Sequence, residues 1–361
     1  MKKLLKLLLK YQLKLPTKSP KSGGFTLIEL LVGIIISALV LLPLLGFMIN
    51  LMETDRKEQA KTASEQEVQS ALNYISRDLD QAIFIYDGFG LNEIRPDLPT
   101  NVTGGTPVLV FWKRNFLEDA LPIKDRNAGE CKPNGPGTNC DDGFVYSLVS
   151  YYLIQDPGCT DPAWSCTARI ARYEFKDQLK DQNNPDRADP IIIRNNGFEV
   201  FNLSPRAANL ANATLEQKMN AWPNQEEASA RRVGSINNNS PQVLIDYIDQ
   251  TIPPAGGLAA EICPPDPHPG MWPNGTEAPE APYPHRQVPP VAAGAASQTS
   301  FYACVDSEKT TAQVFIRGNA LARMRPRNSP STYEKSASAY FPKANILVQG
   351  RGFLKDGSSN Q

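Results

Sequence analysis

The hydrophobic and polar positions divide the chain into stretches of different character. Residues 25–52 form an almost uninterrupted apolar run in which Glu29 is the only charged side chain. A helix of this length, at 1.5 Å per residue, crosses a hydrocarbon core of about 30 Å. We therefore predict a transmembrane helix over residues 25–52. Pro43 lies inside it and lacks an amide hydrogen, so we expect a kink or local unwinding there.

A different pattern follows the apolar run. Residues 53–69 are strongly polar. Apolar residues then recur mostly at spacings of three and four, which is typical of a helix with one face on a core; they are Leu72, Ile75, Leu79, Ala82, Ile83 and Tyr86. The pattern predicts an amphipathic spine helix over residues 53–86, continuous with the first. Arg77 and Asp78 are expected on its solvated face.

The remaining residues, 87–361, predict one extracytoplasmic β-rich domain. Short runs of β-branched and aromatic residues are the candidate strands: 107–112, 144–154, 168–175, 191–193, 198–201, 243–248, 312–317 and 345–349. Residues 209–221 are a candidate helix with Asn209 as N-cap. Twelve of the 31 prolines lie in residues 253–290, which predicts an extended loop. The expected fold class is α+β, with the long helix packed on an antiparallel β-sheet domain that has long Pro/Gly-rich loops.

The first 24 residues contain seven lysines and no acidic side chain. Such a flank stays in the cytoplasm, so the residues after the apolar run are expected on the outer side of the membrane. A secretory signal peptide has a shorter apolar part followed by small residues at the cleavage site. Here the small residues Gly23 and Gly24 precede the apolar run. Cleavage after Gly24 would remove the basic leader and keep the hydrophobic helix.

This arrangement resembles the class III signal of type IV prepilins and pseudopilins. The stretch Gly-Phe-Thr-Leu-Ile-Glu-Leu-Leu, from Gly24 to Leu31, matches the processing motif of that family. The resemblance implies a pilin-like fold, cleavage by a prepilin peptidase between Gly24 and Phe25, and N-methylation of Phe25. It also implies assembly with other pilins or pseudopilins on an inner-membrane platform. There the Glu29 carboxylate would meet the N-terminal amine of a neighbouring subunit.

Glu29 is also unusual on physical grounds. An ionisable group in hydrocarbon costs about 2.5 to 3.5 kcal/mol on insertion scales. A buried carboxylate and a buried ammonium cost much less as a pair than apart, so the pairing acts as a register check. Two simpler interpretations remain open: Glu29 reaches the cytoplasmic surface by snorkelling, or Gly23 and Gly24 form an ordinary loop.

Six cysteines lie on the predicted outer side, and an even number in an oxidising compartment favours three disulfides. Each favoured pair encloses a loop with Pro, Gly or Asp: Cys131 with Cys140, Cys159 with Cys166, and Cys263 with Cys304. The last pair would tether the proline-rich loop. A zinc site is the alternative, but the chain has no Cys-x-x-Cys and only two histidines.

Charge and motifs restrict the function classes. Removal of the leader leaves 30 basic against 38 acidic residues, so the mature chain is acidic and nucleic acid is not an expected partner. Arg323, Arg325 and Arg327 form a local basic cluster that we expect to be a solvated loop. We find no Gly-x-Ser-x-Gly elbow, phosphate-binding loop or zinc-protease helix. We therefore predict a non-enzymatic chain without cofactor. Asp141 and Asp142 leave carbohydrate chemistry or a calcium site open, with a polar turn as the default.

Two further resemblances narrow the expected function. Residues 74–82 are similar to the spine of J-type minor pseudopilins and W-type minor pilins. Residues 314–323, 340–342 and 350–352 are similar to cyanobacterial pseudopilins of hormogonium polysaccharide secretion, which implies export of polysaccharide for gliding motility. Alternatives are a J-type pseudopilin of protein-exporting type II secretion and a minor pilin of a type IV pilus. From another class, the chain would be a membrane-anchored carbohydrate-binding or carbohydrate-active domain.

Overall fold

A computed structural model of the chain describes most of the residues after the leader. The described residues are 24–99, 104–122, 140–156, 158–176, 180–181, 184–188, 198, 200–203, 213–223, 241–258, 263, 286–290, 299–326, 331–352 and 354. The chain separates into two compact units, residues 1–55 and residues 56–361. The predicted strand 191–193 and the predicted leader, apart from Gly24, lie outside the described residues.

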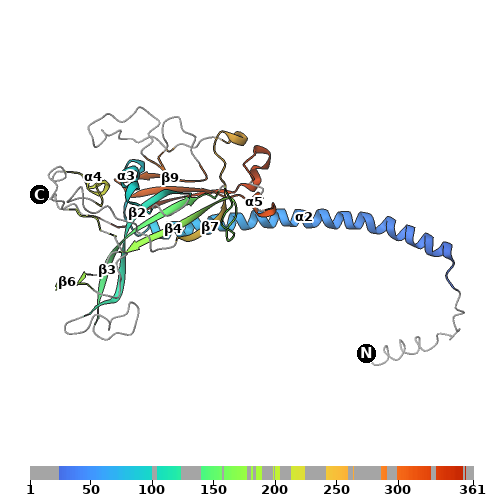
Figure 1. Cartoon of the computed structure of the whole chain (residues 1–361), viewed down its shortest axis with the longest axis horizontal. Helices are drawn as coiled ribbons and strands as arrows, with labels where there is room; N and C mark the ends of the chain where they lie inside the picture. Colours follow the sequence, from blue (N-terminus) through green and yellow to red (C-terminus); the bar gives the residue numbers. More distant parts are fainter. Residues whose placement is uncertain are drawn as a thin grey trace, which may run out of the picture. The chain divides into compact units, whose positions relative to one another are not determined.

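The longest element is helix α2, Leu27–Leu79, drawn in blue in Figure 1. It continues through Pro43 as one helix, so local unwinding is not observed there. In the first unit its side chains are exposed. In the second unit one stripe of α2 becomes buried, because residues at spacings of three and four face the core; the buried apolar residues are Val68, Ala71, Leu72, Ile75 and Leu79.

The prediction that the helix reaches Tyr86 was wrong. Helix α2 ends at Leu79, and Ala82–Ile85 form strand β1. All four residues of β1 are buried, and β1 pairs with the next strand antiparallel, with Phe84 opposite Trp112 and Ile85 opposite Phe111. A short apolar run fits a helical spacing and a buried strand equally well. Pairing with a strand distant in sequence decides the outcome here.

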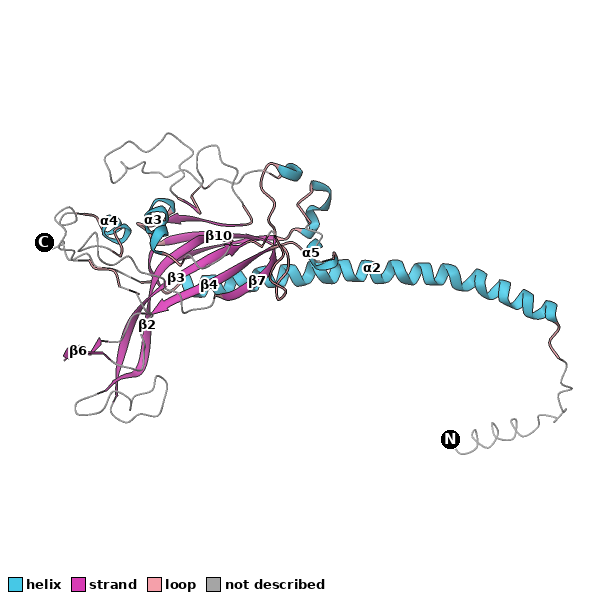
Figure 2. Cartoon of the chain, viewed as in Figure 1, coloured by secondary structure: helices cyan, strands magenta, loops and turns pink. Residues whose placement is uncertain are grey.

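Five antiparallel strands form the larger sheet, in the order β1-β2-β3-β4-β7. The added strands are β2 Gly105–Pro122, β3 Cys140–Ile154, β4 Ala168–Lys176 and β7 Gln242–Ile248. They contain the predicted strands 107–112, 144–154, 168–175 and 243–248, most of them extended at the ends. Figure 2 shows β2, β3, β4 and β7 in magenta. The predicted α+β architecture, a long apolar helix packed against antiparallel sheets, is confirmed.

The two faces of this sheet are covered differently. Asp78 of α2 contacts side chains of β2, β3 and β4 on one face. Trp112 of β2 packs against Phe198, Phe201 and Trp222. Successive side chains of a strand point to opposite faces of the sheet. A sheet that is covered on both faces therefore has long buried runs such as Val108–Lys113.

Four strands form the second sheet, in the order β11-β10-β9-β8. They are β8 Gln287–Val288, β9 Phe301–Asp306, β10 Thr311–Arg317 and β11 Lys343–Gln349. Strands β10 and β11 contain the predicted strands 312–317 and 345–349, whereas β9 was not predicted. The sheets meet where Ile248 at the end of β7 bridges to Gly318. An added Cβ on Gly318 would lie 2.7 Å from Ser64 Oγ and 3.1 Å from Val68 Cγ2 of α2, so a side chain here would require α2 side chains to shift.

Short elements complete the fold. They are α3 Gly88–Ile94, η1 Arg95–Asp97, β5 Lys180–Asp181, β6 Asn184–Ala188, α4 Leu215–Asn220, η3 Ala255–Gly257, α5 Leu321–Met324 and η4 Lys335–Tyr340. The predicted strand 198–201 is not a strand in its described residues, because Phe198 and Phe201 pack on Trp112 instead. The prediction of a helix over residues 209–221 was too long. Its N-cap is Thr214, whose side chain forms a capping box with Gln217, and Asn209 lies outside the described residues.

Candidate functional site

The first candidate site is the segment at which the basic leader meets the apolar helix. Gly24 and Phe25 precede α2, and Phe25 is 82% exposed. Glu29 lies in the first turn of α2, where the positive end of the helix dipole favours a carboxylate. The amides of Glu29 and Leu30 both donate to the Thr26 carbonyl, so the turn is formed. No residue of the described part of the chain pairs with the Glu29 carboxylate.

The apolar side chains of the helix that follows this segment are exposed. The large apolar side chains from Leu27 to Met52 are between 47% and 85% exposed. Among the described residues, α2 is the one helix whose length and composition are sufficient to cross a membrane. A soluble protein rarely exposes so large a contiguous apolar surface, and such a surface indicates contact with lipid or with other helices.

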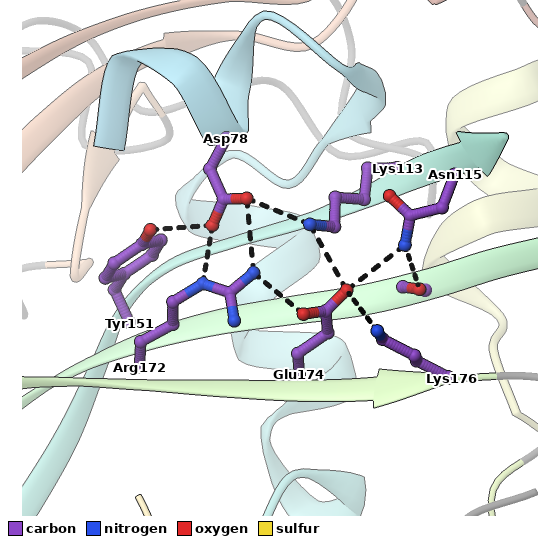
Figure 3. Close-up of polar contacts among 8 residues, drawn as sticks. Asp78, Lys113, Asn115, Tyr151, Arg172, Glu174 and Lys176 are labelled. Carbon is purple, nitrogen blue, oxygen red and sulfur yellow. Dashed lines mark hydrogen bonds and ion pairs between the residues drawn. The ribbon is translucent and has the colours of Figure 1, made fainter. Parts of the chain in front are cut away.

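A second cluster lies in the unit of residues 56–361, which the sequence predicts to be the outer unit. There Asp78 of α2 is buried among charged and polar side chains of three strands (Figure 3). Lys113 Nζ donates to Asp78 Oδ1 at 2.9 Å, and Tyr151 donates to Oδ2 at 2.7 Å. Arg172 donates through Nε at 2.6 Å and through Nη2 at 3.1 Å. Glu174 accepts from Arg172 at 3.0 Å and lies 3.2 Å from Lys113 Nζ. Two anions therefore face two buried cations, and the half-exposed Lys176 lies 3.9 Å from Glu174. Every hydrogen bond to a carboxylate here is charge-assisted.

The cluster shifts the pKa values of its members. Burial raises the pKa of Asp78, but the hydrogen bond from Arg172 and the charge of Lys113 outweigh it, so the pKa lies below its ordinary value. Burial also raises the pKa of Glu174, but the charges of Lys113 and Arg172 outweigh this effect, so the pKa of Glu174 lies below its ordinary value. Burial and the neighbouring Asp78 raise the pKa of Tyr151 well above its ordinary value. The carboxylates stay ionised and the phenol stays a donor over the physiological pH range.

The comparison with known protein families concerns the first candidate site, where the basic leader meets the apolar helix. Residues 19–45 match the family model described as the prokaryotic N-terminal methylation motif. The chain carries this methylation motif. The match includes Gly24, Phe25, Glu29 and Pro43, and it ends inside the apolar run. None of the curated proteins and none of the solved structures compared with the chain gives a match.

The methylation motif is typical of type IV pilins and pseudopilins. It implies processing by a prepilin peptidase and assembly with other pilins, which are usually structural subunits without enzymatic activity. Together with the apolar helix, it indicates a membrane-anchored or pilus-exported protein. The architecture, a long apolar helix with antiparallel sheets, is pilin-like.

The prediction that Asp78 lies on a solvated face was wrong. Its side chain is 9% exposed, because it lies one turn after Ile75 on the stripe that faces the sheet. The spacing of three residues between Ile75 and Asp78 could therefore have been used to predict from the sequence that Asp78 faces the core. Its partners were not foreseeable in the same way, since Lys113, Tyr151 and Arg172 meet Asp78 only through the register of β2, β3 and β4. Arg77, by contrast, is exposed.

The cysteines lie in two described pairs. Cys159 is bonded to Cys166 with 4.9 Å between their Cα atoms, and Cys263 is bonded to Cys304 with 5.5 Å. The second bond ties residue 263 of the proline-rich stretch to β9. Cys131 lies outside the described residues, and nothing is described of the side chain of Cys140.

The basic cluster near the C-terminus is not wholly a solvated loop. Arg323 is mostly buried, forms an ion pair with Glu67 of α2, and stacks over the ring of Tyr247 at 4.3 Å. Arg325 is exposed, and Arg327 lies outside the described residues. Asp142 is exposed. The cluster therefore contributes one arginine to the contact between α2 and the sheets.

Proposed function

We propose that the chain is a membrane-embedded pseudopilin or minor pilin subunit. A prepilin peptidase cleaves it between Gly24 and Phe25 and methylates the new amine of Phe25, and the processed helix then enters a filament of related subunits. The observation that carries the proposal is the methylation motif at residues 19–45, which includes the start of an apolar helix with exposed side chains.

The physical basis of assembly is the change of surroundings of residues 25–52. In the bilayer their apolar side chains contact lipid, and in a filament they contact the same faces of neighbouring helices. Glu29 is then removed from the membrane–water interface and requires a cation, which the amine of Phe25 on a neighbouring subunit supplies. A subunit that enters out of register leaves both charges unpaired.

We further propose that the filament supports polysaccharide secretion and gliding motility. The resemblance of residues 314–323, 340–342 and 350–352 supports this finer function. Some of these residues make close packing contacts. Gly318 lies against α2, and Gly350 and Gly352 lie against the backbone of Ala82. The alternatives are a J-type subunit of protein-exporting type II secretion, a minor pilin of a type IV pilus, and an anchored carbohydrate-binding or carbohydrate-active domain.

The subunit proposal is tested at the N-terminus of the protein isolated from membranes. Intact-mass and N-terminal analysis should find a chain that begins with methylated Phe25. Gly24→Val should block cleavage, whereas the matched Gly33→Val should be processed normally; an added Cβ has open space at both positions, so neither variant disturbs the fold. A wild-type chain that retains its leader in cells with active prepilin peptidase would refute the proposal.

The cargo is tested separately in the producing cells. Deletion of the coding sequence should reduce exported polysaccharide and gliding while leaving the pattern of secreted proteins unchanged. Loss of secreted proteins with normal polysaccharide would favour the type II secretion alternative. Loss of surface pili alone would favour the type IV pilus alternative.

A further inference from the structure

A pocket of about 360 Å³ opens between the spine part of α2 and the edge strand β7. Glu67, Ser70 and Tyr74 line it from α2, Trp164 lines it from the loop before β4, and residues 243–246 line it from β7. Its volume lies within the range of roughly 300 to 1,000 Å³ that is common for small-molecule sites. Two aromatic rings and several hydrogen-bonding groups therefore surround one cavity of the outer unit.

The loop that carries Trp164 is held firmly against β7. The disulfide between Cys159 and Cys166 closes it. Ser165 donates its amide to Asp246 Oδ2 at 2.8 Å and its hydroxyl to Oδ1 at 2.6 Å. Asp246 itself lines the pocket, so the loop and the strand present the Trp164 ring and the Asp246 carboxylate in one arrangement. A fixed arrangement lowers the entropy lost on binding.

Both carboxylates that line the pocket have donors within the chain. Arg323 forms an ion pair with Glu67, and Ser165 donates two hydrogen bonds to the Asp246 carboxylate. The guanidinium of Arg169 lies 5.9 Å from the Trp164 ring centre, and that of Arg172 lies 5.8 Å from the Tyr74 ring centre. These arginines disfavour a cationic ligand on the rings, and the two carboxylates disfavour an anionic one. The surroundings select a neutral ligand with many hydroxyl groups.

We propose that this pocket binds one ring of a neutral polysaccharide. The C–H face of the sugar packs on Tyr74 and Trp164, and its hydroxyls donate to the carboxylates and exchange hydrogen bonds with Ser70. The inference rests on the proposed function in polysaccharide export and assigns it a contact with the cargo. The apolar side chains of Val243 and Leu244 form the part of the lining that excludes water.

The test uses the full chain, purified in a detergent without a sugar head group, because a glycosidic detergent would compete. The probes are maltohexaose, cellohexaose, mannohexaose and xylohexaose, titrated by calorimetry at millimolar concentration. At least one should bind. Tyr74→Ala and Trp164→Ala should each weaken that binding about tenfold or more, and Trp164→Phe should retain most of it. Phe116→Ala removes an aromatic ring on β2 that is also exposed and should leave the affinity unchanged.

Three outcomes would overturn the site. The first is no binding of any of the four oligosaccharides by the wild type. The second is binding that both alanine variants leave unchanged while their melting temperatures match the wild type. If Trp164→Ala fails to fold, Tyr74→Ala decides, since Tyr74 is 38% exposed on α2. The third is binding of alginate hexamer or of a tryptic peptide pool alone, which would assign the pocket to an anionic polymer or to a protein.

Failure here is distinguishable from failure of the proposed function. A chain that is processed at Phe25 and supports polysaccharide export but binds no saccharide refutes only the pocket. A chain that binds a saccharide but keeps its leader refutes the filament subunit and favours the anchored carbohydrate-binding domain.

Discussion

At the level of single residues, Asp78 gives α2 its buried polar attachment to the larger sheet. A buried charge is costly unless a counter-charge and hydrogen bonds compensate it, and Asp78 has both through Lys113, Arg172 and Tyr151. Removing the carboxylate therefore does more than delete one bond. It leaves two buried cations, Lys113 and Arg172, with the partly buried Glu174 as their remaining anion.

Asp78→Asn tests this attachment. The substitution keeps the shape of the side chain and removes its charge, so we expect a loss of about 3 to 5 kcal/mol of folding free energy, because one partner of a buried ion pair is missing. Asp80→Asn is the matched control directly after the end of α2, where the side chain is 40% exposed and lies 4.0 Å from Arg351. It should change stability by about 0.5 kcal/mol or less. Thermal unfolding of the full chain in detergent measures both, and equal losses would contradict the role given to Asp78.

The same cluster makes stability depend on pH. The pKa values of Asp78 and Glu174 are lower in the folded chain than their ordinary values of 3.8 and 4.5. Their contribution to stability is therefore complete above the ordinary values and is lost as the pH falls through the folded ones. The melting temperature should be level above about pH 5 and should fall on acidification. In Asp78→Asn the fall should be smaller, and an unchanged acid slope would show that other groups cause it.

The sequence predicts the residues of the two sites unequally. Gly24, Phe25 and Glu29 are recognisable because their chemistry resides in a contiguous motif, and the methylation motif covers them. The burial of Asp78 is visible only as a position on the apolar stripe of the helix. Its partners Tyr151 and Arg172 follow it by 73 and 94 positions and depend on strand register, which residue spacing does not encode.

At the level of elements, α2 serves two environments with one continuous helix. Its first part exposes apolar side chains on all sides, whereas its last part buries one stripe against the sheets. The change of pattern near residue 53 is readable in the sequence, because a uniformly apolar helix and an amphipathic helix differ in composition. The end at Leu79 is not readable, because Ala82–Ile85 acquire their strand conformation from β2.

The assembly role of the first part of α2 is tested with Glu29→Leu. We expect normal cleavage and methylation, because the peptide bond between Gly24 and Phe25 is unchanged. Incorporation into sheared filaments should fall about tenfold or more, because the neighbouring amine loses its counter-charge. Glu58→Leu removes an exposed glutamate further along the same helix and should be incorporated normally. Immunoblots of membrane and filament fractions measure the ratio, and normal incorporation of Glu29→Leu would refute the pairing.

At the level of the whole molecule, the two disulfides among the described residues stabilise the outer unit unequally. The bond between Cys263 and Cys304 closes 41 positions, and the bond between Cys159 and Cys166 closes seven. A longer closed loop restricts the unfolded chain more. The loop from Cys263 contains much of the proline-rich stretch, which was predicted from its composition as an extended loop.

Double Cys→Ser variants test this difference. Loss of the longer link should cost about 4 kcal/mol, and loss of the shorter one should cost about 2 kcal/mol. Thermal unfolding of the two variants and the wild type, compared under oxidising conditions, measures the order. Non-reducing peptide mapping is the accompanying check. Free thiols at Cys263 and Cys304 in the native protein would refute the longer link.

The backbone contacts of residues 351 and 352 also set an order of events during export. Arg351 donates to the Asp80 carbonyl and Gly352 to the Ala82 carbonyl, each at 3.0 Å, so the turn after α2 is held by residues translated some 270 positions later. In the proposed topology the N-terminal helix enters the membrane first, and these donors reach the outer side last. The outer unit thus completes its folding while already tethered to the membrane. Contacts of such sequence separation form slowly, so the turn after α2 is expected to be among the last parts of the chain to reach its final structure.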